Sequence, residues 1–146
     1  MILDPDNKYI QAINTHIPLP GATILEIGCG DGRLTRDIAR YAAKVVATDL
    51  NLEVLEQAKK NISAKNVDFL YTPDGTPKLL PDSFDMIIYT LSLHHIPTDK
   101  MIDNLYHSSK LLKKKEQSLL LNRGEAALFR RLKNALGREA AMKAWK

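Results

Sequence analysis

The sequence contains one cysteine, Cys29, in 146 residues. A single cysteine excludes an internal disulfide framework and any zinc site built from several thiolates. His16 and His107 have no metal-ligand spacing between them, so we expect no metal site. The length suits one domain with one hydrophobic core, spanning residues 1–146.

Long apolar runs are also missing. No run approaches the roughly 20 residues that a membrane-spanning helix needs. The first residues, Met1-Ile-Leu-Asp-Pro-Asp-Asn, are acidic where a signal peptide is basic. We therefore expect a cytoplasmic protein without a membrane span.

Aromatic residues are few, at 6% of the chain, and no aromatic ladder accompanies the basic residues. Residues 1–99 hold 9 Lys and Arg against 13 Asp and Glu, whereas residues 100–146 hold 12 against 4. This basic C-terminal third favours an anionic partner such as RNA, a membrane surface or an acidic protein. A charged helix face that stays in water is the commoner explanation, and without aromatic residues nucleic acid is a weak candidate.

Apolar runs of strand length alternate with segments of helical periodicity along the whole chain. This alternation predicts an α/β fold: a Rossmann-like, doubly wound, mostly parallel sheet of about five strands with helices on both faces. The expected strands are 24–27, 45–50, 67–72, 84–91 and 118–121. The expected helices are one within 1–20, then 32–43, 52–62, 98–112 and a basic one within 122–146.

Three glycines spaced two apart follow the first expected strand, in Ile24-Leu-Glu-Ile-Gly28-Cys-Gly30-Asp-Gly32. A dinucleotide fingerprint requires its third glycine at position 33, which is Arg33 here. A Walker A loop requires Gly-Lys-Ser/Thr, which Gly32-Arg33-Leu34 lacks. The turn therefore does not match either pyrophosphate-binding pattern, although it lies where doubly wound sheets bind ligands.

Acidic residues follow the next two strands, at Asp49 and Asp74, and a Phe84-Asp85 pair precedes the fourth. Together with residues 24–35, this order resembles the class I S-adenosylmethionine-dependent methyltransferases, most closely the small-molecule group typified by ubiquinone and menaquinone biosynthesis. The resemblance covers roughly residues 20–121. It implies S-adenosyl-L-methionine as cofactor and S-adenosyl-L-homocysteine as product.

The resemblance also implies a role for each matching residue. Glu26 organises the glycine turn and the methionine amino group, and the turn runs close to the methionine moiety. Asp49 accepts both ribose hydroxyls, and Asp74 accepts the adenine amino group. The implied cofactor-binding residues are Glu26, Gly28, Cys29, Gly30, Gly32, Asp49, Leu50, Asp74, Gly75, Thr90 and Leu91. For a lone acid at a strand end, capping of the next helix is the usual alternative.

Methyl transfer from a sulfonium needs alignment of the acceptor, and it needs a base only where the acceptor is protonated. The best candidates for a catalytic base are His94 and His95, directly after the fourth strand. A packing or capping role for both histidines is the commoner alternative. Cys29 lies inside the glycine turn, where we expect a small buried residue and not a nucleophile. A small-molecule acceptor remains, because the Asn/Asp-Pro-Pro-aromatic motif of amino-group enzymes is absent after the fourth strand.

Two features depart from the family pattern. Leu112-Lys-Lys-Lys-Glu-Gln117 stands where family members have a Pro-Gly-Gly turn. After Leu121 the spacing of Leu128 and Leu132 predicts a helix, so we expect the family's C-terminal strand hairpin to be missing. The fifth strand would then be an exposed edge, which either the last helix would cover, or a homo-oligomer or partner protein through residues 118–146.

Three functions stay open on the sequence. The first is a small-molecule methyltransferase. The second is a non-catalytic, S-adenosylmethionine-binding partner subunit. The third is an RNA methyltransferase that uses the basic C-terminus.

Overall fold

The computed structural model describes residues 10–11, 13–14, 18–89, 98–113, 117–123 and 126–132. Strands and helices alternate through most of this range. The strands are β1 (Thr23–Ile27), β2 (Lys44–Asp49), β3 (Val67–Tyr71), β4 (Met86–Tyr89), β5 (Gln117–Arg123) and β6 (Ala126–Leu132). The helices are α2 (Arg33–Ala39), α3 (Leu52–Asn61) and α4 (Thr98–Ser109).

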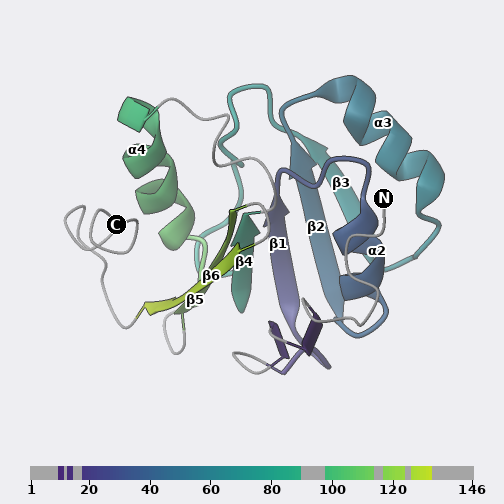
Figure 1. Ribbon diagram of the computed structural model, residues 1–146, viewed down its shortest axis with the longest axis horizontal. Helices are drawn as coiled ribbons and strands as arrows, with labels where there is room; N and C mark the ends of the chain where they lie inside the picture. The colour runs from purple at the N-terminus through teal and green to yellow at the C-terminus, as the bar shows by residue number, and fades with distance from the viewer. Residues whose placement is uncertain are drawn as a thin grey trace.

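The strands form one sheet in the order β3-β2-β1-β4-β5-β6 (Figure 1). All neighbouring pairs from β3 to β5 are parallel, and β6 is antiparallel to β5. The chain order reverses between β1 and β4, which is the topological switch point where such sheets bind ligands. The predicted mostly parallel, doubly wound α/β sheet is therefore confirmed.

Helices pack on both faces of the sheet, with α2 and α3 on one side and α4 on the other (Figure 1). The alternation of side chains along each strand divides the core accordingly. Ile24 of β1 packs in the cluster that contains Ile38 of α2 and Leu55 of α3. Leu25 and its neighbours on the opposite face pack with Leu105 of α4. None of the described helices is long and apolar enough to cross a membrane.

The C-terminal segment corrects one expectation. Residues 126–132 form β6, a strand that pairs with the full length of β5, where the sequence predicted a helix and no hairpin. The spacing of Leu128 and Leu132 fits one face of a helix, but pairing with β5 supplies the backbone partners that an edge strand lacks. β5 is therefore not an exposed edge. The oligomer or partner surface predicted at 118–146 stays a prediction, but an exposed β5 edge no longer supports it. Residues 133–146 lie outside the described residues.

Other boundaries differ less. α2 ends at Ala39, before the predicted end at residue 43, and β4 covers Met86–Tyr89 within the predicted range 84–91. Ile10 and Ile13, on the predicted N-terminal helix, are helical and buried. The long link between β3 and β4 contains Pro73, Pro77, Pro81 and Asp74-Gly75, and it forms no helix.

Asp85 joins the amino ends of two strands, far from the glycine turn. Its carboxylate accepts a hydrogen bond from the Thr23 N–H at 2.8 Å and pairs with Lys113 Nζ at 3.1 Å. We expect Asp85→Ala to lower the free energy of unfolding by about 1–3 kcal/mol, because the Thr23 N–H loses a charged acceptor. Lys113→Ala is the control and should cost less than about 1 kcal/mol, since that ion pair is half exposed. Chemical denaturation of both variants measures the difference, and equal losses would contradict this assignment.

Candidate functional site

The glycine turn connects the carboxyl end of β1 to the start of α2. The N–H groups of Gly28 and Cys29 both donate to the Thr48 carbonyl of β2 at 2.9 Å. Gly28, Gly30 and Gly32 all have positive φ, at 81°, 59° and 89°. The turn is therefore held against the end of β2 by its main chain, in a conformation that glycine adopts without strain.

Gly32 has a second reason to be glycine. A Cβ at this position would lie 2.4 Å from Ile62 Cδ1 and 3.3 Å from Ala58 Cβ, so a side chain fits there only if the Ile62 side chain moves. At Gly30, by contrast, no atom of a described residue other than its two chain neighbours lies within 4 Å of an added Cβ. Backbone conformation and packing both favour glycine at position 32, whereas open space lies beside Gly30.

Asp49 ends β2 and contacts the turn directly. Its Oδ2 accepts the Gly30 N–H at 3.0 Å, and its Oδ1 accepts the Asn51 N–H at 2.8 Å. Asn51, and not Asp49, caps α3, because the Asn51 side chain accepts from the Val54 N–H. The capping alternative for Asp49 therefore does not describe this carboxylate, which joins the carboxyl ends of β1 and β2.

Glu26 is completely buried in β1, beneath α2. Thr35 of α2 is also completely buried, and its hydroxyl donates to the Glu26 carboxylate. The strand places Glu26 on the same face as Ile24, which is the face that α2 covers. A buried carboxylate at the base of the turn fixes α2 to β1. The sequence analysis did not identify Thr35, although a polar residue in the first turn of the helix that follows the glycines was a usable signal.

Cys29 is buried within the turn, as predicted. Burial raises the pKa of its thiol far above the ordinary value, and the charges of Glu26 and Asp49 raise it further. The thiol therefore stays protonated and is a poor nucleophile at neutral pH.

The Asp74-Gly75 loop follows β3 and lies beside Asp49. The Thr72 N–H donates to the Asp49 carbonyl at 2.9 Å, and the Gly75 N–H donates to the Thr72 carbonyl at 2.9 Å. The Asp74 carboxylate accepts the Thr76 N–H at 3.0 Å and is exposed. The structure thus brings together three segments that the sequence had predicted at one sheet edge: the glycine turn, Asp49 and this loop.

Two residues near this edge have unusual surroundings: one is a buried threonine whose hydroxyl makes no hydrogen bond within the described chain, and the other is an exposed leucine. Thr72 is 4% exposed, and its hydroxyl has no hydrogen-bond partner among the described residues. Buried hydroxyls are normally paired, so the Thr72 hydroxyl is an exception among the described residues. Leu50, directly after Asp49, is 44% exposed and presents apolar surface beside the carboxylate. The sequence pointed to Leu50 but contained no signal for Thr72.

Four predicted site residues cannot be placed. Thr90 and Leu91, predicted to lie beside the sulfonium, and His94 and His95, predicted as candidate bases, lie outside the described residues. Their roles stay predictions.

A family model described as a methyltransferase domain matches residues 24–115. An uncharacterised methyltransferase of Mycobacterium bovis is 31% identical over 88 residues, which is 60% of this chain and 45% of that protein. A ubiquinone biosynthesis O-methyltransferase of Xanthomonas campestris is 33% identical over 105 residues, covering 64% of this chain and 44% of that enzyme. The chain thus spans less than half the length of these curated relatives.

Solved structures share the fold. The crystal structure of an S-adenosylmethionine-dependent methyltransferase from Aquifex aeolicus superimposes with a TM-score of 0.69 at 19% identity, covering 81% of this chain and 68% of that one. At this identity the likeness concerns the fold, and it agrees with the sheet order described above.

Proposed function

Because the chain belongs to the methyltransferase domain family, we propose that it binds S-adenosylmethionine at the glycine-turn edge and transfers the methyl group to a small organic acceptor. Family membership confirms the prediction from the sequence of a class I S-adenosylmethionine-dependent methyltransferase domain, and with it the class of cofactor. The single observation that carries the placement is the Asp49 carboxylate, which bonds Gly30 and lies beside the Asp74 loop.

The residues at this edge fit the chemistry of the cofactor. A carboxylate has two oxygens, each with more than one lone pair, so Asp49 can keep its bonds to Gly30 and Asn51 and still accept ribose hydroxyls. The exposed apolar surface of Leu50 suits the face of an adenine ring. The exposed Asp74 carboxylate suits the polar edge of that base.

When bound, S-adenosylmethionine supplies an electrophilic methyl group, and the protein's contribution is position. Glu26 and Thr35 hold α2 on β1 and so keep the turn in place. Asp49 fixes the turn to the end of β2 and presents a charged acceptor. The protonated Cys29 thiol does not compete as a nucleophile for the methyl group. A proton on the acceptor would pass to His94 or His95 if either acts as the base.

The acceptor atom is the second half of this proposal, since oxygen, carbon, nitrogen and sulfur nucleophiles all react with a sulfonium methyl group. Relatives called ubiquinone biosynthesis O-methyltransferase support a small acceptor with an oxygen nucleophile. No described contact favours the non-catalytic subunit or the RNA methyltransferase over this function. A screen of hydroxyl-bearing metabolites for methyl transfer would therefore come first.

Calorimetric titration tests the cofactor half directly. We expect saturable binding of both S-adenosylmethionine and S-adenosylhomocysteine, with no binding of NAD, since the turn lacks the third glycine of a dinucleotide site. Absence of binding by either sulfur nucleoside to the folded protein would contradict the proposal. Cofactor binding without methyl transfer to any acceptor class would favour the partner subunit.

A further inference from the structure

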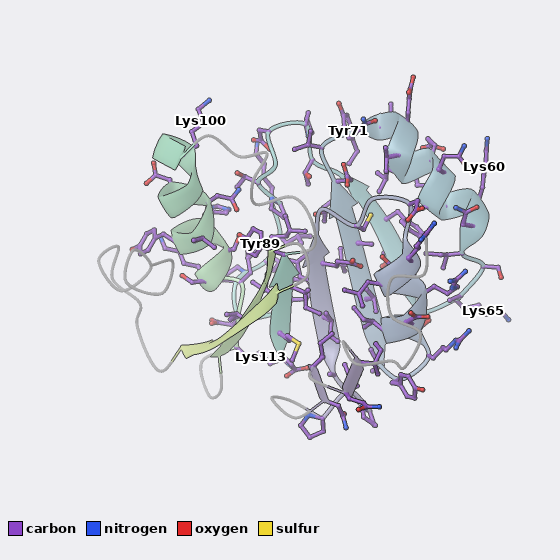
Figure 2. All side chains as sticks on the ribbon, in the orientation of Figure 1. Lys60, Lys65, Tyr71, Tyr89, Lys100 and Lys113 are labelled. Atoms are coloured by element: carbon purple, nitrogen blue, oxygen red, sulfur yellow. The ribbon has the colours of Figure 1, made fainter. Side chains whose placement is uncertain are left out.

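A buried network of side-chain hydrogen bonds connects β4, α4 and the Asp74-Gly75 loop, on the face of the sheet that α4 covers. Tyr89, the last residue of β4, is fully buried, and its hydroxyl lies 2.6 Å from Asn104 Oδ1 and 2.7 Å from Ser108 Oγ. Asn104 and Ser108 are one helical turn apart on α4, so both reach the same hydroxyl. Figure 2 shows Tyr89 in the interior, between the sheet and α4.

The chemistry of these groups determines the direction of each hydrogen bond. An amide oxygen only accepts, so the Tyr89 hydroxyl donates its single proton to Asn104 Oδ1. Ser108 must then donate to the Tyr89 oxygen. Burial raises the pKa of Tyr89 well above its ordinary value, which keeps this phenol protonated as a donor.

The same amide reaches the loop on its other side. Asn104 Nδ2 donates to the Gly75 carbonyl at 3.0 Å and to Thr76 Oγ1 at 3.2 Å. A flipped amide would place Oδ1 against the Gly75 carbonyl, two acceptors facing each other, so its orientation is determined. α4 therefore holds the main chain of the loop at the residue directly after Asp74.

The loop exposes the Asp74 carboxylate to solvent, while Asn104 holds its main chain at Gly75. Gly75 has a φ of 73°, so the loop has a conformation that few residues adopt without support from their surroundings. Discrimination by hydrogen bonds requires donors and acceptors placed within about 0.5 Å.

We propose that Asn104 is a positioning residue that sets the Asp74-Gly75 loop for the 6-amino group of the adenine ring, and thereby makes the site specific for adenine. This inference rests on the proposed function. Asn104 does not touch the cofactor in this scheme. It acts through the Gly75 carbonyl, and Ser108 and Tyr89 orient its amide.

The test compares two ligands that differ at that base position. S-adenosylhomocysteine carries the 6-amino group, and S-inosylhomocysteine carries an oxygen there. Calorimetry of the wild-type protein should show tighter binding of the adenine ligand by about tenfold or more, which is about 1.4 kcal/mol. Asn104→Asp keeps the acceptor for Tyr89 but places a carboxylate oxygen against the Gly75 carbonyl. In that variant the preference should fall to about twofold, through loss of adenine-ligand affinity.

Ser109→Ala is the matched control. Ser109 is buried on the same helix, but its hydroxyl donates to the Tyr106 carbonyl of its own helix at 2.6 Å and not to the loop. This variant should keep the wild-type preference for adenine. Tyr89→Phe keeps the ring volume and removes the donor to Asn104, so it should lower the preference as well and serves if Asn104→Asp fails to fold.

The outcomes separate the two levels of the proposal. Wild-type protein that binds neither ligand would overturn the proposed function, and the role of Asn104 with it. Binding of both ligands with equal affinity would keep the proposed function and overturn adenine specificity. Folded Asn104 and Tyr89 variants that keep the wild-type ratio, or weaken both ligands by the same factor, would reduce Asn104 to a purely structural residue.

Discussion

Replacing Asp49 by alanine is expected to weaken S-adenosylmethionine binding by about 100-fold or more. Hydrogen bonds to a charged acceptor contribute about 1.5–3 kcal/mol each, and each 1.4 kcal/mol is a factor of ten in affinity. The substitution removes the proposed acceptor for the ribose hydroxyls and also frees the Gly30 N–H, which now donates to Asp49 at 3.0 Å. Calorimetric titration of the purified variant measures the loss.

Two further variants separate charge from shape at this position. Asp49→Asn keeps one acceptor oxygen and nearly the same volume, so its affinity should lie between those of wild type and Asp49→Ala. Asp68→Ala removes an acid from the neighbouring strand, where an exposed pair with Lys44 contributes little, and should leave binding unchanged. An Asp49→Ala protein with wild-type affinity would show that this carboxylate only shapes the turn.

The largest expected loss of stability follows from Gly32→Ala, which should lower the free energy of unfolding by about 2–4 kcal/mol. The φ of 89° costs an L-residue roughly 1–2 kcal/mol. The added methyl group also overlaps Ile62 Cδ1 at 2.4 Å, so the end of this buried side chain must move, at about 1–2 kcal/mol, the lower part of the range for overpacking. Urea denaturation gives the difference.

Gly30→Ala is the matched substitution in the same turn. Its φ is 59° and nothing lies within 4 Å of the new Cβ, so its cost in stability should stay near 1–2 kcal/mol. If the cofactor passes through that open space, Gly30→Ala should weaken its binding more than Gly32→Ala does. A Gly32→Ala protein as stable as Gly30→Ala would contradict the packing against α3.

The sequence by itself determined the alternation of strands and helices from β1 to β4 and the methyltransferase family of the domain. Buried strands of a parallel sheet are apolar almost throughout, and the intervening helices repeat at 3.6 residues, so each leaves a strong local signal. The glycines at 28, 30 and 32 and the acids at 49 and 74 lie at or shortly after the carboxyl ends of strands. Parallel strands place their carboxyl ends at one edge of the sheet, so the sequence alone is enough to group these residues.

Only the tertiary structure decided how these groups are held. Residues 126–132 had a spacing compatible with a helix, and pairing with β5 made them a strand because an edge strand needs backbone partners. Thr35 reaches Glu26, and Asn104 reaches the Gly75 carbonyl across 29 positions of the chain. Contacts of this kind follow from which helix covers which face. Residue spacing along the chain does not predict these contacts, because a hydrogen bond between distant segments forms only when the sheet brings the segments together.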